Sequence, residues 1–250
     1  MITHLARAGF YQAGLPLGFI VGDFMFDRLK LLIGEENIAK IASKKVLLVG
    51  LGGVGGFVFE SLVRSGIKNF TVCDGDTFDT SNLNRQILAN QNNIGLNKAL
   101  EAKNRALSIN PDINIEVIDY NLTKDNINKL GAFDYIIDAC DDVSAKIELI
   151  KYAINNNIKI ICSMGTGKRL DPTKLAITRI DKTYNDPLAK VMRSKLKKEG
   201  ITLKIPCVAS TELSINNDKV IASSIFVPAT AGIYLASFVI TDIILNNSSI

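Results

Sequence analysis

The residues best suited to phosphate chemistry gather in one glycine-rich turn. Residues 44–60, KKVLLVGLGGVGGFVFE, join an apolar run to a helix-like pattern through five glycines. Small residues let backbone N–H groups at a helix N-terminus approach phosphates. The turn predicts a nucleotide site, but nicotinamide-dependent dehydrogenases and adenylating enzymes both use such a turn. The five are Gly50, Gly52, Gly53, Gly55 and Gly56, and the first, second and fourth satisfy G-x-G-x-x-G.

Polar clusters follow the glycine turn along the chain. Asp74 lies about twenty residues beyond the turn and directly after an apolar run, where a ribose-binding acid belongs in this motif. Three more clusters combine amide, basic and acidic side chains, which suit phosphate and metal contacts. The clusters are DGD (74–76), NLNRQ (82–86), GLNKA (95–99) and DACDD (138–142).

Together these clusters resemble the ATP-dependent adenylyltransferase superfamily of ThiF, MoeB and the ubiquitin-activating enzymes. Its motifs read G-x-G-G-x-G, D-x-D, N-L-x-R-Q, G-x-x-K and D-x-x-D. The resemblance implies ATP and Mg²⁺ as cofactors, with a monovalent cation as a further candidate. A nicotinamide-dependent dehydrogenase gives no reason for Arg85, Lys98 and Asp141 to recur in this order. A noncatalytic nucleotide-binding scaffold stays open as an alternative.

The chemistry of adenylation explains why such residues are needed. A substrate carboxylate attacks the α-phosphate of ATP and pyrophosphate leaves, so the enzyme need supply only positioning and charge stabilisation. The resemblance implies Arg85, Lys98 and Asp141 as catalytic residues, with Asp141 holding Mg²⁺. It also implies an ATP-binding set: Gly50, Gly52, Gly53, Gly55, Asp74 on the ribose, Asp76 in support, Asn82, Arg85 and Lys98 on the phosphates, and Gln86 ordering the loop.

An upstream segment, residues 25–36, resembles the superfamily's N-terminal R-F-x-R-x-x-L-L-x-G-E-E stretch. In the family an arginine from this helix can reach ATP, sometimes from the partner subunit. Arg28 matches the second arginine, whereas Met25 replaces the first. Arg28 is therefore a further candidate for ATP binding, and a plain amphipathic helix is the alternative.

Three stretches in the second half resemble one branch, the tRNA threonylcarbamoyladenosine dehydratases (TcdA, also called CsdL). They are MGTGKRLDPT (164–173), the pattern D-P-L-A-x-x-x-R-x-x-L-K (186–197) and C-V-x-S-T-E (207–212). The resemblance implies activation of the threonylcarbamoyl carboxylate on an adenosine beside the tRNA anticodon, then ring closure with net loss of water and release of AMP and pyrophosphate. The alternative is activation of a small ubiquitin-like sulfur-carrier protein. Branches that serve such carriers commonly have paired CxxC zinc motifs, which this sequence lacks.

A basic strip is predicted where Asp186 and Pro187 suit the start of a helix. Lys190, Arg193 and Lys197 then lie on one face, at spacing i, i+3 and i+7. The strip is either a tRNA phosphate contact or an ordinary solvated face, and charge alone does not choose between them.

Cysteine and histidine usage narrows the chemistry further. The chain has four cysteines and one histidine, His4, so histidine acid–base catalysis is improbable. The scattered cysteines indicate reduced thiols and a cytoplasmic location. Cys207 stands where ubiquitin-activating relatives carry a catalytic cysteine, but a small buried hydrophobe is the favoured interpretation, since a nucleophile needs a lowered pKa.

Alternating apolar strands and helical patterns must position these residues. Strands are expected near 46–49, 69–73, 113–118, 135–139 and 158–162, with helices between them, which predicts an α/β fold with a doubly wound, mostly parallel sheet. The sequence divides into a leader of unknown role (1–24), a Rossmann-like ATP-binding region (25–165), and a substrate-side extension with a C-terminal strand and helix (166–250) in the same globular domain.

Composition bounds the remaining alternatives. With 250 residues, 47% of them apolar, and a net charge of +4, the chain suits one large domain and permits an anionic partner such as tRNA, and no feature indicates DNA. Residues 221–245 are apolar enough for a membrane span, but Pro228, Gly232 and Asp242 favour a strand to Phe226 followed by a buried helix from about Pro228. The resemblance also implies a homodimer and leaves sulfur-transfer partners open.

Overall fold

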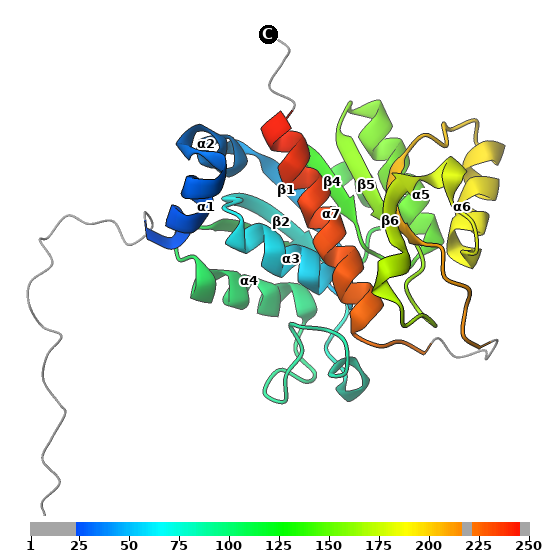
Figure 1. Ribbon diagram of the computed structural model, residues 1–250, viewed down its shortest axis with the longest axis horizontal. Helices are drawn as coiled ribbons and strands as arrows, with labels where there is room; N and C mark the ends of the chain where they lie inside the picture. Colours follow the sequence, from blue (N-terminus) through cyan, green and yellow to red (C-terminus); the bar gives the residue numbers. More distant parts are fainter. Residues whose placement is uncertain (1–23, 217–221, 246–250) are drawn as a thin grey trace, which may run out of the picture.

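A seven-stranded sheet runs through the centre of the protein, in the order β3-β2-β1-β4-β5-β7-β6 (Figure 1). The computed structural model describes residues 24–216 and 222–245, so the leader lies almost wholly outside the described residues. Six strands are parallel and the edge strand β6 is antiparallel to β7. The strands are β1 (Lys45–Val49), β2 (Asn69–Cys73), β3 (Asn114–Ile118), β4 (Tyr135–Asp138), β5 (Lys159–Ser163), β6 (Leu175–Arg179) and β7 (Pro206–Ser210).

Helices cover both faces of the sheet, as the doubly wound prediction requires. Val46 and Leu48 of β1 pack in the cluster that includes α3, α4 and α7, whereas Leu47 and Val49 face α5. Both faces of β1 are buried, which explains its continuous apolar run. The helices are α1 (Asp27–Ile33), α2 (Glu35–Ser43), α3 (Gly55–Arg64), α4 (Lys98–Ile109), α5 (Val143–Asn155), α6 (Pro187–Lys198) and α7 (Phe226–Leu245).

The fold class is confirmed, and the five predicted strands lie within about one residue of their expected bounds. Two strands, β6 and β7, were not predicted individually. The edge strand β6 is largely exposed, so it lacks the apolar run that identified the others. Both strands belong to the same sheet as the five predicted strands.

The expected strand up to Phe226 is wrong for the described part, since residues 222–225 are irregular and α7 begins at Phe226. α7 is the one described helix long and apolar enough to cross a membrane by length and composition. It lies along α3 and the sheet, and Val227, Ala231 and Leu235 are fully buried there. Packing in the core therefore accounts for the apolar residues on this face of α7.

The close contact between α7 and α3 depends on Gly232. A Cβ atom at this position would lie 2.4 Å from the carbonyl oxygen of Val54 and 2.8 Å from the Cβ of Phe57. Backbone atoms of α3 cannot move aside as a flexible side chain would. The absence of a side chain at Gly232 therefore sets how closely α7 approaches the glycine turn.

Overpacking a close contact costs about 1–3 kcal/mol and occasionally more, and a Cβ atom 2.4 Å from a backbone oxygen belongs at the upper end of that range. Because alanine gains roughly 1 kcal/mol over glycine in a helix, we expect Gly232→Ala to lower the free energy of unfolding by about 1–2 kcal/mol in net. Ser237→Ala, on the exposed side of α7, is the matched control and should change stability by less than about 0.5 kcal/mol. Urea denaturation measures both variants; a Gly232→Ala variant as stable as the parent would contradict this account.

Candidate active site

One cavity of about 880 Å³ lies at the carboxyl ends of the parallel strands. Ligands of doubly wound sheets bind at this edge. The glycine turn after β1, the acids after β2 and β4, and the loop between β2 and α4 all contribute to its lining. The motif residues in its wall are Gly50, Gly52, Gly53, Asp74, Asp76, Asn82, Arg85, Gln86, Lys98 and Asp141. Residues scattered over ninety positions therefore share one cavity.

The glycine turn allows two close backbone approaches. Gly50 has φ +91°, and a Cβ there would lie 2.8 Å from the backbone of Ala139, so a side chain is excluded twice over. A Cβ at Gly55 would meet the carbonyl oxygen of Gly50 at 1.8 Å. Gly55 does not line the cavity, and instead lets α3 start directly behind the turn.

Asp74 fixes the turn from β2. Its carboxylate accepts hydrogen bonds from the backbone N–H of Leu51 at 2.7 Å and of Asp76 at 2.9 Å. Burial raises the pKa of the Asp74 carboxyl group, against the opposing effect of those hydrogen bonds. The side chain joins the glycine turn to the end of β2.

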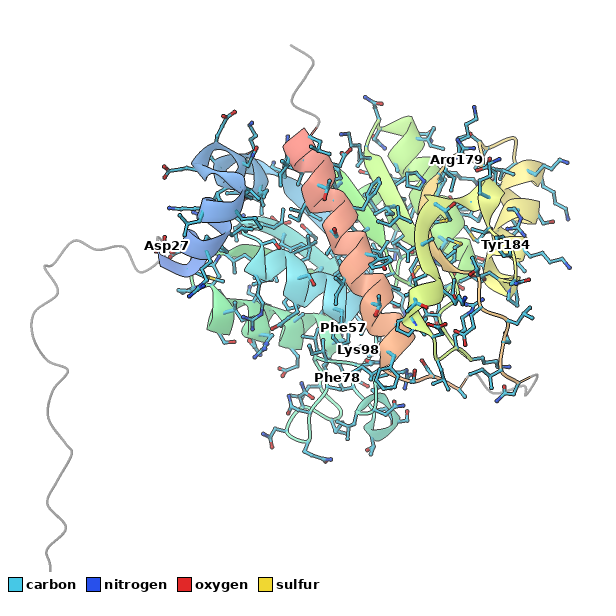
Figure 2. The ribbon with its side chains drawn as sticks, viewed as in Figure 1. Asp27, Phe57, Phe78, Lys98, Arg179 and Tyr184 are labelled. Atoms are coloured by element: carbon cyan, nitrogen blue, oxygen red, sulfur yellow. The ribbon has the colours of Figure 1, made fainter. Side chains whose placement is uncertain are left out.

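Lys98 stands at the start of α4, among the loops at the lower end of the molecule in Figure 2. The residue is only 6% exposed, and Nζ lies 3.2 Å from a carboxylate oxygen of Asp76. Asn97 caps the helix by accepting from the N–H groups of Ala99 and Leu100. Asp76 therefore holds the Lys98 ammonium group at the cavity wall.

The loop NLNRQ contributes one half-exposed cation and two buried amides. Asn82 is buried and accepts from the backbone N–H of Asp79, so it completes the capping box of a short helix that Asp79 caps. Arg85 donates to the carbonyl of Ser81 at 2.7 Å and remains half-exposed beside the cavity. Gln86 is 6% exposed, and its Oε1 has no hydrogen-bond partner among the described residues. A buried acceptor without a partner in the wall indicates a donor supplied by a ligand or by water.

Asp141 is exposed at the cavity, and no described residue pairs with its carboxylate. The neighbouring Asp142 is engaged in capping α5 through the N–H of Ala145 at 2.7 Å. No cluster of three or more His, Cys, Asp or Glu side chains suited to a metal occurs among residues 24–216 and 222–245. A metal here would therefore depend on Asp141 together with ligand oxygens.

A buried ion pair, which the sequence analysis did not predict, lies beneath the loop that carries Asp141. Asp138 and Lys146 are both fully buried, and Nζ of Lys146 lies 2.9 Å from Asp138 and 2.8 Å from the carbonyl of Ser163. Burial alone would lower the pKa of Lys146, but Asp138 raises it, so the amine stays protonated. The sequence signal that could have indicated this pair is Lys146, a lysine among the apolar positions of a predicted helix.

Cys207 does not have the setting of a nucleophile. It is fully buried in β7, and it does not line the cavity. Burial, with a smaller effect of Asp186, raises the pKa of its thiol to about 12. A nucleophilic cysteine requires the opposite shift, so the structure favours the buried-hydrophobe alternative.

Arg28 lies away from this chain's own cavity. It is exposed on α1, whose preceding residue Phe26 packs against Gly66 at the far end of α3. Asp27, its neighbour, lies well apart from Lys98 in Figure 2. Arg28 thus does not join the residues that line the cavity.

The predicted basic strip forms on α6, and Asp186 caps that helix through the N–H of Ala189 at 3.0 Å. Lys190 and Lys197 are exposed. Arg193 instead turns back and donates to the carbonyl of Thr183 at 2.9 Å and to its hydroxyl. Spacing placed these residues on one helix face, but Arg193 holds the segment before α6.

Comparison with known proteins identifies the group to which this chain is similar. The profile of the ThiF family matches residues 26–240. A tRNA threonylcarbamoyladenosine dehydratase from Bacillus subtilis (strain 168) is 34% identical over 239 residues, covering 88% of this chain and 94% of the relative. One from Escherichia coli (strain K12) is 38% identical over 190 residues, covering 72% of this chain and 71% of the relative.

Comparison with solved structures gives the same result as the sequence comparisons. The crystal structure of E. coli tRNA N6-threonylcarbamoyladenosine dehydratase in complex with ATP has a TM-score of 0.83 at 34% identity, covering 88% of this chain and 93% of that chain. The complex with AMP has a TM-score of 0.82, covering 86% and 91%. Both the superfamily and the branch inferred from the motifs are thereby confirmed. The chain belongs to the ThiF family of adenylating enzymes.

Proposed function

We propose that this protein is an ATP-dependent tRNA threonylcarbamoyladenosine dehydratase, which cyclises the modified adenosine beside the anticodon. One observation carries the proposal: the phosphate-type residues line a single cavity together with Gly165, Thr166 and Gly167 of the branch-specific stretch. The names of the relatives supply the substrate class. Under this proposal the ATP-binding half and the branch-specific half serve one reaction.

The cavity accounts for the activation step. The ribose of ATP lies at Asp74, and Arg85 and Lys98 contact the phosphates. A carboxylate oxygen of the substrate forms a bond to the α-phosphorus while the bond to pyrophosphate breaks, giving an acyl-adenylate. A carboxylate is already a nucleophile at neutral pH, so the positioned cations need only stabilise phosphate charge.

Ring closure then needs no second cofactor. An atom of the same side chain attacks the activated carbonyl, AMP leaves with the acyl C–O bond's electron pair, and a proton is lost. The net change in the nucleoside is loss of one water, whose oxygen leaves on AMP. A thiol nucleophile is not required, which agrees with the burial of Cys207.

Mg²⁺ fits the donor set, and Asp141 would hold it. Mg²⁺ is usually bound through one or two carboxylates plus substrate phosphates and waters. Asp141 offers one carboxylate without a partner among the described residues. When bound, the ion would neutralise phosphate charge. The monovalent cation stays a prediction.

We also propose that the protein is a cytoplasmic homodimer, in which the guanidinium of Arg28 of the partner subunit reaches the ATP site. Leu31 and Leu32 of α1 are 88% and 79% exposed, so an apolar patch adjoins Arg28. Light scattering of the intact chain should give twice the monomer mass. A monomer at micromolar concentration would contradict this assembly, and sulfur-transfer partners stay a separate prediction.

The exposed lysines of α6 are proposed to contact tRNA phosphates. We expect Lys190→Ala and Lys197→Ala each to weaken tRNA binding and to reduce the slope of log affinity against log salt by about 1, because one phosphate contact is lost. Lys103→Ala, an exposed lysine of α4, is the matched control. Filter binding at several salt concentrations measures the slopes. Equal slopes for the parent and the two α6 variants would identify the strip as a solvated face.

Mass spectrometry tests the proposed reaction directly. The protein is incubated with ATP, Mg²⁺ and tRNA that carries threonylcarbamoyladenosine, and nucleosides and AMP are followed together. We expect loss of one water mass with AMP formed in step. Asp141→Asn and Arg85→Ala should each lower kcat by roughly 100-fold, because each removes charge stabilisation at the phosphates.

Cys207→Ala is the control, and it should keep kcat within about twofold because a buried thiol of raised pKa takes no part in the chemistry. Full activity of Asp141→Asn and Arg85→Ala would indicate a noncatalytic scaffold. AMP formation without a change in tRNA mass would redirect the search to another carboxylate, such as that of a sulfur-carrier protein.

A further inference from the structure

The cavity has a second wall, formed by the segment that follows β5. Gly165, Thr166 and Gly167 line it, with Leu188 of α6 and Ser223 before α7. Along the carboxyl edge, the sheet order places the ribose acid after β2, the glycine turn after β1, Asp141 after β4 and this wall after β5. The wall therefore stands at the end of the cavity opposite the ribose position.

Three hydrogen-bond donors of this wall lack a partner in the part of the chain that the structure describes. Among the described residues, none accepts a hydrogen bond from the N–H groups of Thr166 and Gly167 or from the Thr166 hydroxyl. The N–H of the preceding Gly165 is already engaged with Asp186 at 2.9 Å. A wall of unpaired, uncharged donors suits a ligand rich in acceptor oxygens, such as a carboxylate next to a urea group.

A buried arginine behind the wall holds it in place. Arg169 is 3% exposed, and its guanidinium donates to the carbonyls of Gly165, Asn185 and Glu212, the last two at 2.8 and 3.1 Å. It also lies 3.9 Å from the carboxylate of Asp186. Arg169 does not line the cavity, so its effect on a ligand must pass through the segments it joins.

Two acidic side chains complete the arrangement. Asp186 binds the N–H of Gly165 and caps α6. The Glu212 carboxylate accepts from the N–H groups of Leu170 and Asp171 at 3.0–3.2 Å. The buried guanidinium of Arg169 therefore connects three segments: the one after β5, the one before α6 and the one after β7.

The cost of leaving a buried guanidinium unpaired makes the Arg169 site rigid. A buried guanidinium is tolerated only where its N–H groups are paired, and removing such a charge leaves three carbonyls without their donor. Each carbonyl belongs to a different segment, so the wall would lose its position relative to the glycine turn. A misplacement of about 1 Å can cost roughly 100-fold in rate.

We propose that residues 165–167, with Leu188 and Ser223, form the subsite for the carboxylate-bearing side chain of the modified nucleoside, and that Arg169 is the positioning residue of this subsite. This inference rests on the proposed dehydratase function. It assigns the non-nucleotide substrate to the β5 end of the cavity and leaves ATP to the β1 and β2 end.

The test compares three variants with a matched control. Thr166→Val removes one donor from the wall at nearly constant volume. Arg169→Met removes the buried charge, and Glu212→Gln weakens the same arrangement more mildly should Arg169→Met fail to fold. Arg179→Met is the control, because Arg179 is exposed, pairs only with Asp181 in the described contacts, and lies far from Lys98 in Figure 2.

Three quantities are measured on the full chain: the Kd of AMP by calorimetry, and kcat and KM for tRNA carrying threonylcarbamoyladenosine. We expect Thr166→Val to lower kcat/KM about tenfold, since a hydrogen bond to a charged group is lost. Arg169→Met should lower it roughly 100-fold, and Glu212→Gln by an intermediate factor. The Kd of AMP should stay within about twofold in all, and Arg179→Met should match the parent.

The inference is overturned if Thr166→Val keeps the parental kcat/KM, or if Arg169→Met or Glu212→Gln weakens AMP binding as much as it weakens tRNA turnover. The latter result would mean a general structural role for the arginine site. Failure of the proposed function is distinguishable from failure of this inference. In that case the parent protein itself binds AMP but leaves the tRNA mass unchanged.

Discussion

The buried ion pair between Asp138 and Lys146 is the interaction on which the site's geometry depends. It joins the last residue of β4 to the carbonyl of Ser163 at the end of β5, with both charged side chains fully removed from solvent. Two buried charges are tolerated only when their geometry is good and their remaining hydrogen bonds are made. Because Lys146 comes from α5, one side chain fixes two strands and the helix that covers them. The loops carrying Asp141 and Gly165 therefore start from fixed points.

The two ends of the cavity are then shaped by opposite physical means. At β1 the chain comes close to itself because side chains are absent: Gly50 meets the backbone of Ala139, and Gly55 meets Gly50. At β5 the chain is held apart, since the guanidinium of Arg169 fills the space between three segments and bonds to each. Backbone N–H groups at a glycine turn suit phosphates of any nucleotide, whereas a wall held by one buried side chain can change between branches without altering the turn.

Local patterns were sufficient for the parallel strands and the glycine turn, because an apolar run or a glycine spacing is contained within one segment. The Arg169 site and the Lys146 pair were not predictable in this way, since each joins segments that are distant in sequence. Spacing also failed to give the direction of a flexible side chain, as Arg193 shows by turning back to Thr183. The apolar residues before Pro228 read as a strand, but the α7 helix already begins at Phe226. The composition of residues 221–245 predicted that the segment is buried, whereas tertiary packing determined its secondary structure.

The carboxylates of the cavity indicate what kind of catalysis it can support. Asp74 accepts two backbone N–H groups, Asp76 holds Lys98, and Asp142 caps α5. Asp141 is the one cavity carboxylate without a partner among the described residues, and it is the residue that we propose as the Mg²⁺ ligand. A general base would need a free carboxylate of its own at the wall formed by residues 165–167, Leu188 and Ser223, where the lining residues are uncharged. The site is thus arranged to align two substrates and to balance phosphate charge, which suffices because the attacking carboxylate arrives already ionised.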